Sequence, residues 1–402
     1  MKRNFLLMGL LVLGLGMSFT SCGDDDDNEN GNENGKVVDS ETAVGFGNAF
    51  KNHVAGSGYT SAESCVEQII DGCIDIANEV GTSKIGEPYD LYISGNTDEA
   101  LYAVESWYSW HSRNDYKNNI VSIANSLVNV RIEEDLSSFD YSSIMKSSNP
   151  TASIMVKFAS RNDIRSYATT VWQDVVDAWT AIDAIPQPFR NNINSKETVA
   201  AMQACATLVS DLEKLKGKIS ELSESDCQEI IDNYVDIVVL PTYKDLNEKN
   251  SALYTAVLNL QKNPSDKNFE AACDAWMDAR QPWETSEAFL FGPVSELGLD
   301  PNMDSWPLDE DGIKGILASQ KWSDLDWSGD YDEENEAIEA AQSLRGFHTL
   351  EYLLFLDGNP RTTSDTSYSA STDAWLNYSV NVALLLKQDA ALLYKHWTEV
   401  EY

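Results

Sequence analysis

Basic residues are scarce in this chain, and their shortage narrows the range of partners. Only 28 Lys and Arg residues oppose 65 Asp and Glu residues over 402 positions, which gives a formal net charge of -37. A surface this acidic repels phosphate backbones, so nucleic acid is excluded as a partner. Such a surface also attracts cations, but diffuse charge serves solubility first and does not by itself form a cation site.

Paired cysteines and several catalytic motifs are also missing. The sequence holds six cysteines but no C-x-x-C, so neither a zinc knuckle nor a redox pair is expected. Apart from Cys22, five remain, and they fit either buried small hydrophobic residues or, in an oxidising compartment, one disulfide. No G-x-S-x-G, phosphate-binding loop or dinucleotide fingerprint occurs, so nothing supports a nucleophilic serine or a nucleotide site.

No apolar run is long enough to span a membrane comfortably, and the longest one stands near the N-terminus. Residues 6–17 follow the basic residues Lys2 and Arg3, as in an export signal. The run leads into FTSC at residues 19–22, which resembles the lipobox of Gram-negative lipoproteins. This resemblance implies that residues 1–21 are a signal peptide and that Cys22 carries a lipid. The alternative is a plain cleaved signal.

Residues 22–39 have the composition of a lipid-attached, disordered tether. They hold the acidic run GDDDD at residues 23–27 and then mainly Asn, Glu and Gly, with nothing to bury. An acidic cluster directly after the lipid cysteine resembles the surface-export signal of some Gram-negative lipoproteins. We therefore expect an outer-membrane lipoprotein, anchored at the cell surface or at the periplasmic face.

Helical periodicity runs through the rest of the chain, and no alternating strand pattern stands out. Hydrophobic residues make up 43% of the sequence, enough for one large core or two ordinary ones. We expect an all-α fold of two packed four-helix bundles, residues 40–223 and 224–402. A weak similarity between residues 69–76 and 230–237 suggests related halves, although amphipathic positions also agree by chance.

The helix boundaries follow from capping residues, prolines and glycines. A capping box is expected at residues 225–228, a kink at Pro241 and a loop at residues 81–95. The other expected helices span residues 41–53, 61–80, 115–130, 150–185, 195–222, 266–291, 332–356 and 372–397.

A histidine and a glutamate on one helix face form the most informative pattern. The sequence GFHTLE at residues 346–351 places His348 and Glu351 three positions apart, so their Cβ atoms lie about 5–6 Å apart. Such a pair can share one cation, and nitrogen with carboxylate suits iron or zinc. Zinc proteases of the H-E-x-x-H type need a second histidine four positions on, where this chain has Tyr352. The alternative is a hydrogen-bonded pair in the core.

Two further clusters carry polar or aromatic side chains. Residues 280–293 place Arg280, Glu284 and Glu287 around the helix-breaking Pro282, either as a polar site or as an ion pair that braces the kink. Residues 105–112, ESWYSWHS, pack three aromatic residues among hydroxyl groups. These aromatic residues suit either a sugar platform or a plug that packs a loop on the core.

These blocks resemble the imelysin-like family. GFHTLE matches the family's G-x-H-x-x-E signature, and residues 280–292 look like its Arg-x-Pro block followed by Glu-x-Phe-x-Phe-Gly. WPLD at residues 306–309 matches a third block, and the tyrosine and proline within residues 233–246 resemble the opening helix of the family's first domain. Four blocks in the right mutual order make the resemblance specific.

The order of the halves departs from the usual family pattern. The G-x-H-x-x-E domain normally comes first, whereas here it occupies the second half of the chain. The first half looks like the domain that normally follows, so the chain resembles a circular permutation. Such a permutation is physically easy when two bundles pack side by side with neighbouring termini.

The resemblance also implies a polar site between two four-helix bundles. His348 and Glu351 become the expected metal ligands, with iron or zinc as the metal, and the expected ligand-binding residues are Arg280, Glu287, Trp306, Glu105, Ser109 and Ser112. Because the guanidinium of Arg280 repels a bare cation, we expect either a metal that an anionic carrier already holds or an anion that bridges the metal and Arg280.

The resemblance links the chain to bacterial iron uptake. It implies iron or an iron-bearing ligand, and iron-transport components, as partners. The family was first classed as a metallopeptidase, but a zinc protease normally has three protein ligands and a water. We therefore expect binding rather than hydrolysis, with a metal-dependent peptidase and a glycan-binding surface lipoprotein as alternatives.

Overall fold

The computed structural model describes residues 42–133 and 135–402, and helices account for nearly all regular structure in them. The expected signal peptide, Cys22 and the acidic tether lie outside these residues. Within the described part, no helix is long and apolar enough to cross a membrane. The strands found there are β1 (Phe355–Leu356) and β2 (Asn359–Pro360), a short antiparallel pair.

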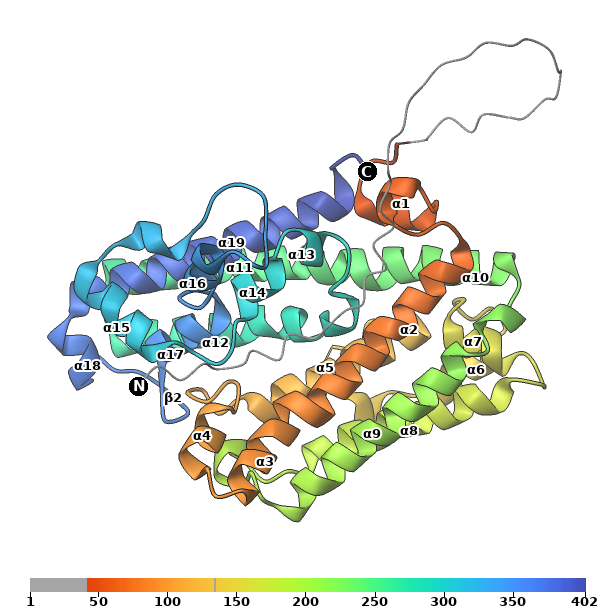
Figure 1. Ribbon diagram of the computed structural model, residues 1–402, viewed down its shortest axis with the longest axis horizontal. Coiled ribbons are helices and arrows are strands. Elements are labelled where there is room, and N and C mark those ends of the chain that lie inside the picture. Colours follow the sequence, from red (N-terminus) through yellow and green to blue (C-terminus); the bar gives the residue numbers. More distant parts are fainter. Residues whose placement is uncertain (1–41, 134) are drawn as a thin grey trace, which may run out of the picture. The chain divides into compact units, whose positions relative to one another are not determined.

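The first bundle consists of four helices that each pack against two of the others (Figure 1). Ser61 begins the first of them, because its side chain accepts a hydrogen bond from the backbone N–H of Ser64. The expected amphipathic helix within residues 115–130 is instead buried on nearly all sides, since it lies between its own bundle and the second one. The helices are α2 (Ala62–Glu79), α5 (Ser112–Val128), α8 (Arg165–Asp183) and α9 (Lys196–Lys216).

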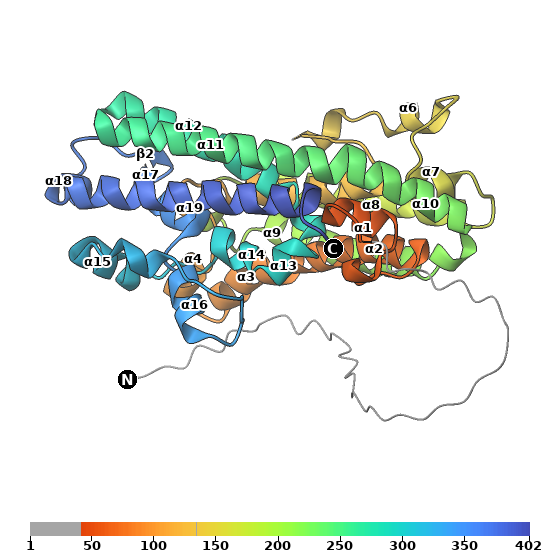
Figure 2. The same cartoon turned by 90° about the horizontal axis from the view of Figure 1, so that it is seen from above.

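The second bundle has the same arrangement of four helices, seen from above in Figure 2. They are α11 (Leu240–Lys262), α12 (Asp266–Glu284), α17 (Gly346–Leu354) and α19 (Thr372–Thr398). Two outer helices cross between the groups: α10 (Glu224–Asn233) packs on α2, and α1 (Phe46–Lys51) packs on α19. The expected all-α fold with two packed four-helix bundles is confirmed.

Shorter elements connect these helices. The short α-helices are α3 (Gly86–Ile93), α4 (Thr97–Tyr102), α6 (Tyr141–Lys146), α7 (Ile154–Ala159), α13 (Pro293–Glu296), α14 (Leu299–Asp304), α15 (Glu310–Ser319), α16 (Glu336–Gln342) and α18 (Thr366–Ala370). The 3-10 turns are Ala55–Ser57, Leu136–Ser138, Phe189–Asn191, Ile219–Glu221, Glu287–Phe289 and Trp322–Leu325, and π-helical turns cover Val80–Lys84 and Tyr234–Val239.

One expected helix, residues 332–356, is broken into α16 and α17. Gly346 stands at the break with a φ of 89°. A Cβ atom at Gly346 would lie 2.6 Å from the backbone oxygen of Met303, so only glycine lets the chain pass this close to the end of α14. The break therefore places His348 in the first turn of α17, directly beside α14.

Other expected boundaries were wrong for local reasons. Residues 150–185 form α7 and α8, because the polar residues 160–163 favour a turn over a continued helix. Residues 81–95 are largely helical, since Gly81 lets this segment pack closely on Cys205 of α9. The capping residue of α10 is Ser223, paired with Asp226, rather than a residue within 225–228.

The five described cysteines form no disulfide. They are free and buried, as small hydrophobic residues would be.

The first and last described segments are joined by backbone hydrogen bonds. Gly45 donates to Val400 at 2.8 Å, and Ala43 and Tyr402 exchange two more at 3.1 and 3.0 Å. The first and last described segments therefore lie side by side.

Candidate functional site

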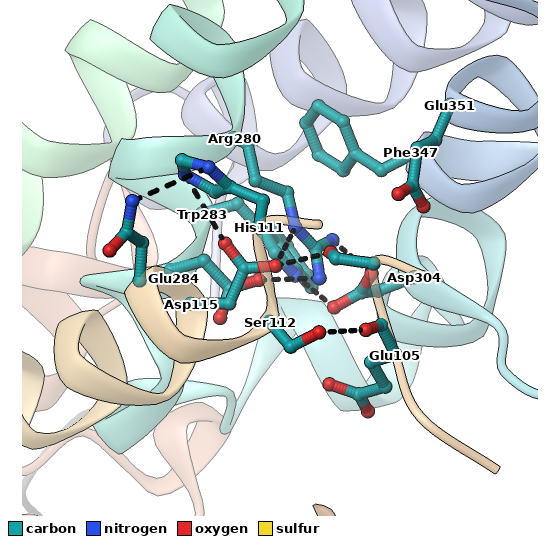
Figure 3. A network of polar contacts seen from close by, with 12 residues as sticks. Glu105, His111, Ser112, Asp115, Arg280, Trp283, Glu284, Asp304, Phe347 and Glu351 are labelled. Atoms are coloured by element: carbon teal, nitrogen blue, oxygen red, sulfur yellow. Dashed lines mark hydrogen bonds and ion pairs between the residues drawn. The ribbon is translucent and has the colours of Figure 1, made fainter. Parts of the chain in front are cut away.

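A network of charged side chains is buried between the two bundles, with Arg280 at its centre. Arg280 and Glu284 lie one turn apart on α12, on the face that packs against α5. Figure 3 shows Arg280 between three carboxylates: Asp115 from α5, Glu284, and Asp304 from the end of α14. Arg280, Asp115 and Glu284 are each 0% exposed, so the network is shielded from water.

Arg280 has more negative partners than its single charge needs. A guanidinium nitrogen lies 2.7 Å from Oε1 of Glu284, Nε lies 3.4 Å from Oδ2 of Asp115, and a third ion pair joins Asp304. Burial opposes the charge, but these carboxylates raise the pKa of Arg280 well above its ordinary value. An anion approaching Arg280 would therefore meet these three carboxylates.

His348 and Glu351 form a pair that also ties the bundles together. Nδ1 of His348 lies 3.2 Å from Oε2 of Glu351, and Nε2 lies 3.1 Å from Oδ1 of Asp304. Burial and Arg280 lower the pKa of His348, but Asp304 and Glu351 outweigh them and raise it to about 9. The imidazole is thus positively charged at neutral pH, with both nitrogens engaged.

The other carboxylate oxygen of Glu351 reaches across to the first bundle. Oε1 accepts hydrogen bonds from the backbone N–H of Tyr108 at 3.0 Å, from the N–H of Ser109 at 2.7 Å and from its hydroxyl at 2.7 Å. The ring of Trp306 packs edge-on against His348, with 4.7 Å between the ring centroids. Ser109 and Trp306 therefore lie beside the histidine–glutamate pair.

Glu105 and Ser112 lie next to this network, around the side chain of Lys84. The ammonium of Lys84 is 3.0 Å from Glu105 and 3.4 Å from Glu79, and the Ser112 hydroxyl donates to the backbone oxygen of Glu105 at 2.6 Å. Burial raises the pKa of Glu105, although Lys84 acts in the opposite direction. Glu105 is therefore paired with a cation that it shares with Glu79.

Glu287 differs from all of these residues. It is 8% exposed, and its carboxylate makes no hydrogen bond or ion pair with any described residue. One oxygen each from Glu284, Glu287 and Asp304 lie within 4.8 Å of one another, and we call this group the carboxylate cage. Burial raises the pKa of Glu287 well above its ordinary value and that of Glu284 to about 8.

The buried charges of the interface do not balance. Six carboxylates lie there against three cationic groups, which leaves an excess of three negative charges when all are ionised. The carboxylates are Glu105, Asp115, Glu284, Glu287, Asp304 and Glu351, and the cationic groups are Lys84, Arg280 and His348. Buried charge without a partner is costly, so the interface favours protons or an added cation.

The sequence did not single out Lys84, Asp115 or Asp304 as site residues, and it offered Glu284 only as part of a polar site or ion pair around Pro282. Glu284 stands four residues after Arg280, a spacing that does signal a helical ion pair. Lys84 lies in a segment expected to be a loop, and Asp115 lies near the start of an expected amphipathic helix. Neither position carries a signal in one sequence, because only tertiary packing brings them to the interface.

A surface cleft of about 330 Å³ opens beside the network. Tyr108 and Trp306, which contact Glu351 and His348, line this cleft together with Tyr102, Trp107 and Glu310. The rings of Tyr102 and Trp107 stack at 5.5 Å between centroids, and the Tyr108 hydroxyl donates to Glu310 at 2.5 Å. The cleft thus reaches the outer side of the same residues that bound the buried network.

Comparison with known proteins identifies the family. The family described as Peptidase M75, imelysin, matches residues 36–218 and 239–402. A solved structure of an imelysin peptidase from Bacteroides ovatus is 53% identical in sequence, with a TM-score of 0.71, and the match covers 78% of this chain and 86% of that one. The chain belongs to the imelysin family.

A curated relative matches a shorter part of the chain. Iron-regulated protein A from Synechococcus elongatus is 36% identical over 138 residues. The match covers 34% of each chain, so this chain spans about a third of the length of that relative.

Proposed function

We propose that this protein binds a metal cation, or a small ligand that bears one, between its two bundles during iron uptake. The observation that carries the proposal is the gathering of six carboxylates around three cationic groups at the interface, which leaves three negative charges in excess when all are ionised. A cation supplies the missing charge without the cost of burying an unpaired carboxylate. The name of the Synechococcus relative supports iron as the metal in question.

The geometry favours a cation over the anionic carrier expected from the sequence. Arg280 was the reason to expect an anion, but three carboxylates surround it. Any further anion would add to an interface that is already too negative. The metal should therefore bind as a cation, or in a ligand with little negative charge.

Metal analysis and calorimetry test the proposal directly. Purified protein is analysed for metals, stripped with a chelator, and titrated with ferric and ferrous iron and with zinc. We expect saturable binding and a higher unfolding temperature on metal addition, because a ligand at 100 times its Kd stabilises the fold by about 2.7 kcal/mol. Stripped protein that neither binds nor is stabilised by any of these metals would refute the proposal.

A metal-dependent peptidase remains the alternative function. Its zinc would need three protein ligands and an open position for water. Both nitrogens of His348 already face carboxylates at 3.1 and 3.2 Å, which favours binding over hydrolysis. If the same sample cleaves a peptide in a metal-dependent way, and His348→Ala and Glu351→Gln abolish the cleavage, the peptidase function would rank above binding.

The surface cleft favours glycan binding as a second candidate function. Flat aromatic faces and carboxylates are the groups that recognise sugars, and Tyr102, Trp107 and Glu310 bring both to the cleft. Tryptophan fluorescence during titration with maltotriose or chitotriose provides the test. Saturable quenching that Tyr102→Ala weakens would support it, and an unchanged spectrum with both sugars would count against it.

We also propose a lipid anchor at Cys22 and an outer-membrane location. The support is the apolar run that ends in FTSC and the acidic segment after it. Mass spectrometry of the native N-terminus is the test. We expect a lipidated Cys22, and an unmodified mature protein that begins elsewhere would contradict the anchor.

We also propose that the two halves of this chain are circularly permuted relative to the usual order in the family. The support is the side-by-side position of residues 43–45 and 400–402, because permutation requires neighbouring ends. A chain that joins these ends and opens near Glu224 should fold with the same helical circular dichroism. A chain so relinked that fails to fold would count against the permutation.

A further inference from the structure

We propose that the carboxylate cage, Glu284, Glu287 and Asp304, is the first coordination shell of the bound cation, and that the His348–Glu351 pair instead braces the two bundles. The inference rests on the proposed metal binding and adds which side chains hold the ion. On this assignment the histidine of the G-x-H-x-x-E motif is not a metal ligand.

The spacing of the cage fits one ion. Its three oxygen atoms lie within 4.8 Å of one another. Oxygen ligands lie about 2.0–2.6 Å from the divalent cations that prefer them, so two oxygens on one ion are at most about 5 Å apart. Glu284 ends α12, Glu287 lies three residues on in a 3-10 turn, and Asp304 ends α14, so three elements close around the same point.

Glu287 shows that the cage is incomplete. The residue as a whole is 92% buried, since its exposed fraction is 8%, and its carboxylate makes no hydrogen bond or ion pair among the described residues, although the charge of Lys84 acts on it. A buried carboxylate normally has a partner, because burying one without a partner costs several kcal/mol. Glu287 also points to the same spot as the oxygens of Glu284 and Asp304, so that spot is where the absent partner belongs.

The acceptor positions of the neighbouring carboxylates support this assignment. An ionised carboxylate accepts about four hydrogen bonds. Glu351 receives four contacts, three at Oε1 and one at Oε2. Asp304 receives three, Glu284 two and Glu287 none. Free acceptor positions therefore remain in the cage, and outside it Oδ1 of Asp115 also lacks a hydrogen bond.

Both ring nitrogens of His348 already face carboxylates. Each ring nitrogen carries either one proton or one lone pair, and both nitrogens contact carboxylates, Glu351 and Asp304. A metal at His348 would have to displace one of these carboxylates. His348 also positions Glu351, whose carboxylate accepts hydrogen bonds from the backbone N–H groups of Tyr108 and Ser109 in the other bundle.

The donor set defines the class of metal. Three carboxylates without imidazole or thiolate suit hard, oxygen-preferring cations such as Mn²⁺, and ferric iron belongs to the same class by its high charge. Arg280 lies beside the cage and weakens binding of any cation. The three carboxylates outnumber it, so the balance still favours a multiply charged ion.

Stripped full-length protein titrated with Mn²⁺ provides the test, with free Mn²⁺ measured by electron paramagnetic resonance and ferric nitrilotriacetate as a second probe. Glu287→Gln keeps the shape and removes the charge, and it should weaken Mn²⁺ binding at least tenfold. Glu351→Gln and His348→Gln are the matched controls, because they change equally buried members of the same network. They should weaken binding less than Glu287→Gln does, because they reach the cage only through Asp304.

A measurement on the unaltered protein keeps the test independent of how the variants fold. Pulsed electron paramagnetic resonance of bound Mn²⁺ detects imidazole nitrogen, and we expect none. Nitrogen coupling, or a Glu287→Gln protein that binds like wild type while His348→Gln does not, would overturn the cage and leave metal binding intact. Wild-type protein that binds neither Mn²⁺ nor ferric iron would instead refute the proposed function itself.

Discussion

Two groups of buried polar side chains meet at Asp304, and they differ in how fully their atoms are paired. The histidine–glutamate pair has a partner for both ring nitrogens and for both carboxylate oxygens. The cage contains Glu287, which has no partner among the described residues. A fully paired network stiffens a fold, whereas an unpaired buried charge marks a place for something else to bind.

The residues that identify the family in the sequence are therefore not the residues whose polar atoms are free to bind a ligand. The motif at residues 346–351 is what identifies the chain from its sequence, yet its polar atoms already serve the packing of α17 against the first bundle. The cage residues lie in and next to a broken helix end, where polar atoms are less constrained by the helix itself. The following variants test the contrast between the fully paired motif and the cage.

Replacement of Arg280 should have the largest effect. Arg280→Met leaves Asp115, Glu284 and Asp304 buried without their shared cation, which should lower the free energy of unfolding by about 3–5 kcal/mol. Urea denaturation of metal-free protein measures this loss. Arg190→Met is the control, because Arg190 is only partly buried against Trp107 and should cost far less. Equal losses in the two variants would mean that the network contributes little.

The two glutamates should respond with opposite signs in metal-free protein. Glu351→Gln weakens hydrogen bonds to a charged acceptor and should cost about 1.5–3 kcal/mol. Glu287→Gln removes an unpaired buried charge and should raise the stability.

The pH dependence of that difference has a definite sign. Burial raises the pKa of Glu287 in the folded state above 4.5, so the folded protein retains a proton that the unfolded chain releases. This contribution is fully present below pH 4.5 and is lost as the pH rises. The advantage of Glu287→Gln over wild type should therefore be smallest near pH 4.5 and grow toward pH 8. A constant difference over that range in chelator-treated protein would contradict the assignment.

Loss of one hydroxyl in the completed pair should have the smallest effect. Ser109→Ala removes one of the donors to Oε1 of Glu351 but keeps the two backbone donors. We expect a loss of about 1 kcal/mol and no change in metal affinity. Thermal unfolding and the Mn²⁺ titration measure the two quantities, and a large fall in affinity would place the metal beside Glu351 after all.

The sequence predicted the fold class well, because amphipathic periodicity and capping residues are local signals. Ser61 marks the start of α2 as expected. The break before α17 was missed, because Gly346 is required by contact with the distant Met303 rather than by its neighbours. Residues 81–95 were missed for a similar reason, since the packing of Gly81 on α9 decides their structure.

The candidate site was predictable only in part. Spacing alone places His348 beside Glu351 and Arg280 beside Glu284 on their helices. It does not reveal that Asp304 contacts both pairs, nor that Lys84 neutralises Glu105. These contacts join residues far apart in the chain, and a single sequence carries no record of them. The unpaired state of Glu287 is likewise a property of the packed interface.

Tyr108 gives the interface one more property. Its backbone N–H holds Glu351, while its ring lines the surface cleft and its hydroxyl donates to Glu310. If a molecule in the cleft shifts the backbone of Tyr108, the bond to Glu351 changes, and His348 connects Glu351 to Asp304. Reciprocity would then require that a cation at the interface change the affinity of the cleft for its occupant by the same factor. Tyr108 is therefore the residue that connects the surface cleft to the buried interface.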